Sequence, residues 1–202
     1  MDALFIPTAK RTTRVETPVS GGIYMAADKI TAREAGALFG ATMAASMMGI
    51  FVGIYMLFVD VDIALRITAA VLVGIVGILS FLRHSVWFKS DQVRKGWYQE
   101  HPEYQLEVGY ANLAFGIWGI IVPALNWGAL ACGVIIGTYG TYLLCTLFLH
   151  AYEAFWGEDL HRPEHRMRAR HSVVSTGVFV IFLYAFAIIA LVHAGVIPFL
   201  KF

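Results

Sequence analysis

The chain has 202 residues, a formal net charge of +1, and 58% hydrophobic residues against 14% charged ones. Its mean hydropathy of +0.67 excludes an ordinary soluble domain and predicts a membrane protein. The basic residues are scattered among the predicted loops, which excludes a nucleic-acid surface, so no nucleic-acid partner is expected.

About five apolar stretches approach the roughly 20 residues that a membrane-spanning helix needs. Their hydrophobicity is continuous rather than alternating, which favours helices over barrel strands. We therefore predict an all-α, polytopic membrane bundle over residues 31–202, preceded by a cytoplasmic or interfacial arm over residues 1–30. In chain order, the predicted helices cover about 34–59, 63–84, 103–122, 129–156 and 172–196.

Local signals mark several of these boundaries. Thr31 followed three residues later by Glu34 predicts a capping box at the start of the first helix. Asp60 and Asp62 mark a tight turn, and Asp62 is expected to cap the second helix. Residues 85–102 mix aromatic and basic side chains next to a span, which predicts a segment lying at the membrane interface.

Lysine and arginine gather on one side of this topology, which holds 13 of the 15 basic residues, leaving only Arg66 and Lys201 on the other. Basic residues near helix ends mark the cytoplasmic side, so we predict a cytoplasmic N-terminus in the cytoplasmic membrane. In the loop after the fourth helix, a basic group is expected to contact anionic lipid headgroups. Its members are Arg162, Arg166, Arg168 and Arg170.

The fourth predicted helix carries a polar stripe whose residues follow one another at spacings of three or four, and therefore share one helical face. Its members are Tyr139, Tyr142, Thr146, His150 and Glu153. The opposite face is aliphatic and suits lipid, so the stripe should face the bundle interior, where polar groups can find partners. These five residues are therefore candidates for lining a ligand pocket.

Two residues of the third helix complete this candidate pocket. Glu107 lies at the helix entry, and Asn112 lies further into the span. In a compact bundle Glu107, His150 and Glu153 could converge, and this ligand set suits a metal ion, a proton relay or a quinone head group. The alternative is that His150 and Glu153 bond each other, Arg83 or water at the membrane boundary. Glu107 would then pair with a nearby arginine.

Asn112 also shares a helical face with three glycines, which form a narrow groove on the third helix. The groove predicts close contact with another helix, and the Asn112 amide is expected to make an interhelical hydrogen bond there. The glycines are Gly109, Gly116 and Gly119. Ligand contact is the alternative use of Asn112. The first helix contains two similar small-residue pairs, Gly36/Gly40 and Gly49/Gly53, which predict close approach of a neighbouring helix.

The run from Glu107 to Gly119 (EVGYANLAFGIWG), followed by a helix with His150 near its end, resembles a family of small uncharacterised prokaryotic membrane proteins. The resemblance covers roughly residues 104–153. It implies a multi-span fold in a prokaryotic inner membrane, and it marks Glu107, Asn112 and His150 without giving a substrate.

A fainter likeness, carried by His101, Pro102 and Tyr104, is to membrane methyltransferases of the isoprenylcysteine and phospholipid type. The chain departs from that pattern because Glu100 stands where those enzymes have an arginine. A further span also follows the segment that would be catalytic.

The leading interpretation is a non-catalytic accessory or structural membrane protein that acts through helix association. It rests on the small-residue faces and on the lack of a complete catalytic or metal signature. The alternative is a small membrane enzyme, or a protein that handles a ligand or protons, with a cytoplasm-facing pocket built on Glu107, His150 and Glu153. The sequence requires no cofactor. Its expected partners are membrane lipids and a homo-oligomer or larger membrane complex.

Overall fold

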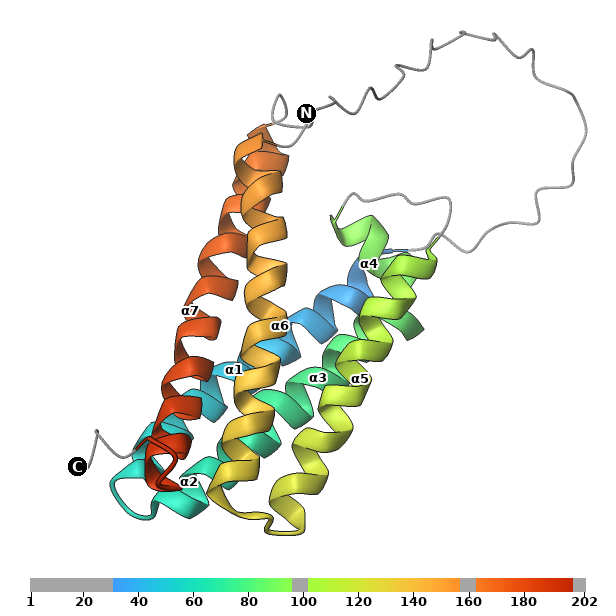
Figure 1. Cartoon of the computed structure of the whole chain (residues 1–202). Coiled ribbons are helices and arrows are strands. Elements are labelled where there is room, and N and C mark those ends of the chain that lie inside the picture. Colours follow the sequence, from blue (N-terminus) through green and yellow to red (C-terminus); the bar gives the residue numbers. More distant parts are fainter. Residues whose placement is uncertain (1–30, 96–101, 157–162, 198–202) are drawn as a thin grey trace, which may run out of the picture.

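The computed structural model describes residues 31–95, 102–156 and 163–197, with the backbone alone for 163–169. Its regular structure in these ranges is helical throughout (Figure 1). Five helical spans are long and apolar enough to cross a membrane. This finding confirms the predicted all-α membrane bundle. The predicted arm, residues 1–30, lies outside the described part of the chain.

The first span is α1 (Arg33–Leu57). The second span is one continuous helix in four pieces, of which η1 and η2 are π-helical: α2 (Val61–Thr68), η1 (Ala69–Ile75), α3 (Val76–Phe81) and η2 (Leu82–Val86). The remaining helices are the short α4 (Phe88–Lys95), then α5 (Glu103–Ala124), α6 (Gly128–Trp156) and α7 (Pro163–His193).

The start of α1 is held by a residue far away in the sequence. The Ala35 amide in its first turn donates to Ser90 Oγ of α4 at 3.0 Å, and Ser90 in turn donates to the Thr31 carbonyl at 2.7 Å. The first amides of a helix lack partners within the helix, so Ser90 supplies one from outside. The predicted box partners Thr31 and Glu34 bond each other instead, at 3.3 Å. Helix α4 is thereby attached to the end of α1.

The start of α2 differs from the prediction. Asp60, rather than Asp62, caps the helix, because its Oδ1 accepts from the Ile63 amide at 3.0 Å while its backbone is extended. The helix therefore begins at Val61. Asp62 lies in the first turn and pairs with His193 at the end of α7, at 3.3 Å.

Helix α5 lies against α3 and η1 at a glycine-lined contact (Figure 1). A β-carbon added at Gly119 would lie 2.5 Å from the Gly74 nitrogen, and one added at Gly77 would lie 2.9 Å from the Gly116 α-carbon. The two backbones thus touch directly, which confirms the groove predicted beside Asn112. Lipid tails are as apolar as leucine, so close contacts of this kind, rather than hydrophobicity, determine which helices pair in a membrane.

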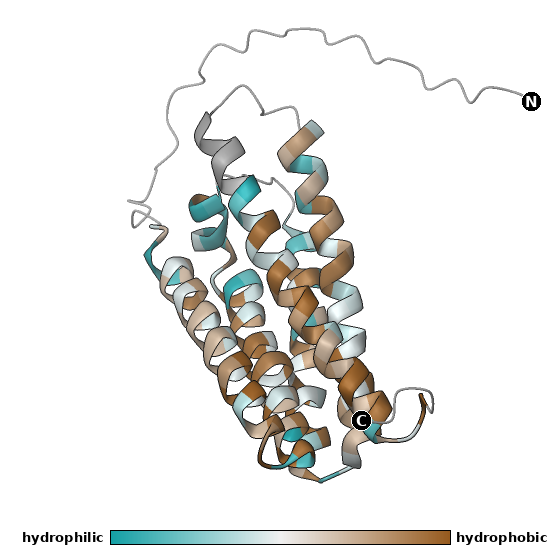
Figure 2. Cartoon of the chain, turned by 90° about the vertical axis from the view of Figure 1, so that its left-hand side faces the viewer, coloured by the Kyte–Doolittle hydropathy of each residue, from teal (hydrophilic) through white to brown (hydrophobic). Residues whose placement is uncertain are grey.

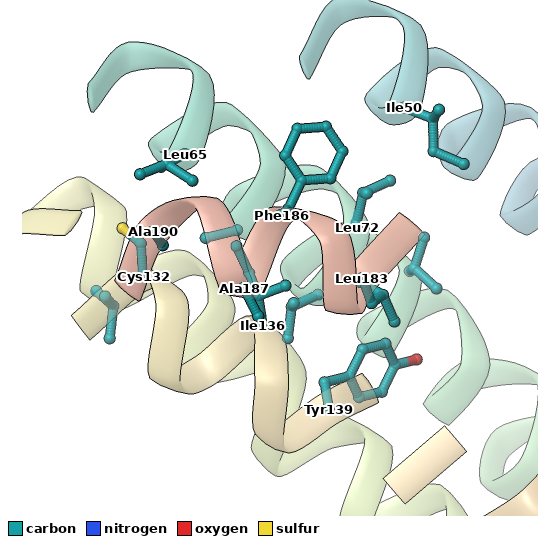
Figure 3. Packing of buried hydrophobic residues seen from close by; sticks show 14 of the residues in the cluster. Ile50, Leu65, Leu72, Cys132, Ile136, Tyr139, Leu183, Phe186, Ala187 and Ala190 are labelled. Atoms are coloured by element: carbon teal, nitrogen blue, oxygen red, sulfur yellow. The ribbon is translucent and has the colours of Figure 1, made fainter. Parts of the chain in front are cut away.

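The apolar core lies where α6 and α7 meet the first two spans (Figure 3). Leu65 and Leu72 of the second span, Ile136 of α6 and Leu183 of α7 are each 0% exposed, and Phe186 fills the space between them. Helices α6 and α7 pack against each other along most of their length. The core therefore fixes this hairpin to the rest of the bundle at one end.

The polar residues gather at the two ends of the bundle, and apolar residues cover its middle (Figure 2). Helix α6 has 29 residues and α7 has 31, so they are about 44 and 46 Å long, more than the ~30 Å hydrocarbon core of a bilayer. They extend past α5 at the end where α4 lies (Figure 1). That end of the bundle carries a cluster of charged side chains from η2 and α4.

Candidate polar site at the α4 end of the bundle

Asp91 of α4 is the centre of a charged cluster. Its side chain is 0% exposed, and both carboxylate oxygens are fully used. Oδ2 faces His84 Nδ1 at 2.9 Å and accepts from Gln105 Nε2 at 3.4 Å. Oδ1 accepts from Nε and Nη2 of Arg94 at 3.1 and 3.0 Å. These bonds join η2, α4 and α5. We call Arg83, His84, Asp91, Arg94 and Lys95 the Asp91 cluster.

The π-helical turn η2 presents two successive side chains, Arg83 and His84, to this cluster. Arg83 Nη2 lies 2.9 Å from His84 Nε2. Arginine has only donors, so Nε2 must accept, and Nδ1 must carry the hydrogen that is donated to Asp91. The geometry therefore requires a neutral His84 with its proton on Nδ1. Widened π-turns of this kind frequently occur at functional sites.

Phe39 of α1 lies under both arginines of the cluster. The Arg83 guanidinium carbon is 5.5 Å from the ring centroid and that of Arg94 is 4.7 Å away. Stacking on an aromatic face offsets part of the cost of removing a guanidinium from water. Residues from α1, η2, α4 and α5 thus build one site.

The cluster shifts the pKa values of two titratable groups of α4, a helix that lies outside the spans. Burial would raise the pKa of Asp91, but the His84 hydrogen bond and the positive charges of Lys95 and Arg83 outweigh it, so this pKa lies below its ordinary value. Burial lowers the pKa of Lys95 to about 8; Asp91 opposes this shift, while Arg83 and Arg94 add to it. Glu153 of α6 is near enough to raise it slightly.

We expect Lys95→Met to change how stability depends on pH. Between a folded pKa of about 8 and the ordinary value of about 10.4, the unfolded chain binds more protons, so stability should rise with pH. The thermal midpoint of the wild type in detergent should rise across this window, and that of Lys95→Met should rise less. Lys89→Met, an exposed position on the same helix, should keep the wild-type profile. Identical profiles for all three proteins would contradict the assignment.

A second polar group lies deeper in the bundle, around Asn112. Its Nδ2 donates to Tyr142 OH at 3.1 Å, and its Oδ1 accepts from Tyr139 OH at 3.3 Å. Phe115 packs against both tyrosine rings, with centroid distances of 5.3 Å. Asn112 therefore makes the interhelical hydrogen bonds that we predicted, between α5 and α6.

Tyr142→Phe should weaken the contact between α5 and α6 by about 0.6 kcal/mol, the typical value for one interhelical hydrogen bond in a membrane protein. Asn112→Leu should cost about twice as much, because it removes both tyrosine bonds. The readout is the free energy of unfolding in mixed micelles. Tyr110→Phe, on an exposed ring of α5, is the matched control and should have no effect. A Tyr142→Phe protein as stable as this control would contradict the assignment.

The outer part of the polar stripe stays close to its own helix. His150 Nδ1 lies 3.5 Å from Glu153 Oε2, and Thr146 Oγ1 donates to the Tyr142 carbonyl at 3.2 Å. Glu107 is exposed on α5, and no hydrogen bond or ion pair within the described residues joins it to His150 or Glu153. The structure thus brings His150 and Glu153 together and leaves Glu107 apart.

The separation of Glu107 from His150 and Glu153 affects the predicted metal site, which needs all three side chains. Among the residues described here, no three histidine, cysteine, aspartate or glutamate side chains are grouped to hold a metal ion. The predicted set of Glu107, His150 and Glu153 is therefore not assembled, because α5 and α6 diverge towards the α4 end (Figure 1).

Other predicted contacts fall partly outside the description. Arg170 is exposed at the start of the last span, as a headgroup contact would require. The side chains of Arg162, Arg166 and Arg168 lie outside the described residues, and so does His101. Tyr104 is 76% exposed on α5.

A model of a family of unknown function, DUF6790, matches residues 35–196. The chain belongs to this family. No curated protein and no solved structure is significantly similar to it. The match includes Glu107 to Gly119, which agrees with the predicted membership of an uncharacterised family.

Sequence reasoning missed Asp91 as a functional candidate in this DUF6790 protein. It assigned residues 85–102 to the membrane interface because basic and aromatic residues dominate there. The structure instead folds 88–95 into α4 and buries Ser90, Asp91 and Gln92. The sequence did contain one signal. Arg83 and His84 lie at the end of a span, where charged side chains need a partner, and Asp91 is the next acidic residue along the chain.

Proposed function

We propose that the protein is a non-catalytic accessory or structural subunit of the membrane that acts through helix association. The observation that carries this proposal is a small-residue face on α1 that no other described residue covers. A β-carbon added at Gly36 or Gly40 would have no described atom within 4 Å. Three neighbouring alanines are also exposed, namely Ala37, Ala41 and Ala44. Small residues on a span allow another helix to approach closely.

A second copy of the chain is the occupant that we propose for this face. The same stripe can serve both members of a two-fold pair, because such an interface is self-complementary. Further along α1, Met48 and Phe51 are 56% and 65% exposed and would extend the contact. Inside the bundle, in contrast, glycine faces such as that of α5 are already occupied.

Cysteine cross-linking tests this proposal. In a chain in which Cys132 and Cys145 are replaced by alanine, Ala44→Cys should give an oxidised dimer in native membranes. Val178→Cys, exposed on α7, is the matched control and should remain monomeric. Adding Gly40→Leu should abolish the Ala44→Cys dimer. Equal cross-linking at both positions, or none at Ala44, would contradict the proposed pair.

We also propose that the protein lies in the inner membrane of a prokaryote with its N-terminus in the cytoplasm. The placement of 13 of 15 basic residues on one side supports this orientation. Alkaline phosphatase fused to the C-terminus should be active, because five spans put the C-terminus outside. An inactive fusion together with a fluorescent C-terminal GFP fusion would contradict the orientation.

A ligand- or proton-handling role is the second candidate. It is favoured by the proximity of Glu153, beside His150, to the buried charges of the Asp91 cluster. In this role His150 and Glu153 would bind the ligand or a metal, with Tyr142 and Asn112 positioning the ligand. Elemental analysis and an optical spectrum of the purified protein test it. A bound metal, haem or quinone that His150→Ala removes without unfolding the protein would support this role over the first.

A further inference from the structure

The last turns of α6 direct an aromatic face away from the protein. Tyr152, Phe155 and Trp156 are 61%, 52% and 68% exposed, and we call these three residues the Trp156 face. The Trp156 ring contacts both others, with centroid distances of 6.4 Å to Tyr152 and 5.7 Å to Phe155. His150 and Glu153 lie on a different face, with side chains 14% and 35% exposed. A helix that turns its aromatic side outward and its polar side inward is not suited to bulk water.

The distribution of charge places a membrane boundary just before the Trp156 face. No charged residue and no histidine occurs in α6 from Gly128 to Leu149, or in α7 from Ser172 to Val192. Each stretch is about 32 Å long, close to the ~30 Å hydrocarbon core of a bilayer. The Trp156 face begins about 3 Å and ends about 9 Å beyond His150, which is the depth of the headgroup layer. Its side chains lean towards the helix N-terminus, and therefore back towards the membrane.

A second aromatic pair lies at the opposite end of the bundle. Trp118 of α5 and Trp127, in the turn before α6, are 47% and 52% exposed, and their ring centroids are 5.9 Å apart. Trp127 and Trp156 are about 43 Å apart along α6, and a tilt of about 20° would reduce this distance to about 41 Å. A bilayer with its headgroups is roughly 40–45 Å thick. The two aromatic groups therefore have the separation of the two interfaces, where tryptophan and tyrosine are enriched.

Arg170 of α7 lies at the same level as the Trp156 face. Helices α6 and α7 are antiparallel, and Gly177 lies against Leu147. Two turns further along, this register places Arg170 beside the turn of α6 that holds Glu153. Arg170 is exposed, and a guanidinium binds phosphate oxygens in pairs. We propose that the Trp156 face and Arg170 form a surface that binds the phospholipid headgroup layer at the α4 end. This surface does not depend on the second copy proposed for α1.

Spin-label accessibility of the full chain in vesicles tests this proposal. In a chain in which Cys132 and Cys145 are replaced by alanine, Phe155→Cys, Arg170→Cys and Val178→Cys are each labelled with a nitroxide. The vesicles contain phosphatidylethanolamine and phosphatidylglycerol. Oxygen concentrates in hydrocarbon and a nickel chelate in water, so the ratio of their collision rates with the label reports depth.

The oxygen-to-nickel ratio should be high at Val178, the matched control, which is exposed within the last span. It should be lowest for the free label in buffer. The proposal predicts ratios at 155 and 170 that equal each other and lie between these two references. A ratio at 155 equal to that in buffer would overturn it, because the Trp156 face would then project into water. A ratio equal to that at Val178 would also overturn it.

Low collision rates of both reagents at 155 would overturn the proposal in favour of a protein partner on the Trp156 face. Repeating the measurement at a lower ratio of protein to lipid identifies that partner, since contact with a second copy is lost on dilution. Tyr152→Cys supplies a second label on the same face, in case Phe155→Cys disturbs the ring contacts. It should give the same intermediate ratio as Phe155→Cys, and an aqueous ratio at both positions would overturn the proposal.

Discussion

Asp91→Ala is expected to destabilise the folded protein by about 3–5 kcal/mol, the cost of removing one partner from a buried ion pair. The substitution leaves Arg83, His84 and Arg94 facing one another without their shared carboxylate. It also removes the bonds that join Asp91 of α4 to His84 of η2 and to Gln105 of α5. The measurement is the free energy of unfolding in mixed micelles.

The control for this substitution is Asp62→Ala. Asp62 also pairs with a histidine, His193, at 3.3 Å, but its side chain is 63% exposed. Water screens such a pair, so the expected loss is below about 1 kcal/mol. Similar losses for the two aspartates would contradict the structural role of Asp91.

The sign of the pH dependence follows from the lowered pKa of Asp91. A carboxyl group whose pKa is lower in the folded state stabilises fully above its unfolded value of about 3.9, and this contribution is lost as the pH falls further. The difference between wild type and Asp91→Ala should therefore persist from about pH 5 to about pH 7 and shrink in acid, and it should also shrink above neutral pH as Lys95, whose pKa Asp91 raises, loses its proton. A difference that disappeared between pH ~5 and ~7 would contradict this assignment.

Gly119→Ala is expected to cost about 3 kcal/mol or more, because the new methyl group would meet backbone atoms rather than a flexible side chain. The added carbon would lie 2.5 Å from the Gly74 nitrogen and 2.8 Å from its α-carbon. Helix α5 and the η1 part of the second span would have to separate, which would also loosen the neighbouring contact between Gly77 of α3 and Gly116. Loss of folded protein in membranes and a lower thermal midpoint in detergent are the readouts.

Gly177→Ala, inside α7, is the matched control, because the nearest atoms to the added carbon are the Leu147 methyl groups at 3.8 and 3.9 Å, an ordinary contact. Alanine favours the helix, so this variant should gain about 0.4–1 kcal/mol. Opposite signs for the two substitutions would show that contact, and not helix propensity, sets the effect at Gly119. Equal small effects would contradict the close contact between η1 and α5.

Much of the fold could be predicted because each signal was local. Five continuous apolar runs predicted the five spans, and the spacing of Gly109, Gly116 and Gly119 predicted a close helix contact. The amide of Asn112 was expected to bond another helix, since hydrocarbon offers it no partner. The cap at Asp60 was missed because two aspartates, Asp60 and Asp62, lie two positions apart, and only the backbone conformation decided between them.

The candidate site was harder to predict, because its members come from four separate elements. The stripe on α6 predicted that Tyr139, Tyr142 and His150 share a face, but the stripe could not tell which helix would meet each of them. Helices α5 and α6 diverge, and this divergence separates Glu107 from His150. The angle between two helices cannot be read from the periodicity of either sequence segment. The burial of Asp91 likewise depends on how α4 turns back onto α1.

The sequence by itself determined that this protein crosses a membrane as five helices and which residues on α5 pack closely, because hydropathy and the positions of small residues along one helix are properties of the chain alone. Only the tertiary structure decided that Asp91, and not Glu107, is the buried acid at the α4 end. Electrostatic partners are chosen by distance across helices, and that distance is set by packing angles that no single segment encodes.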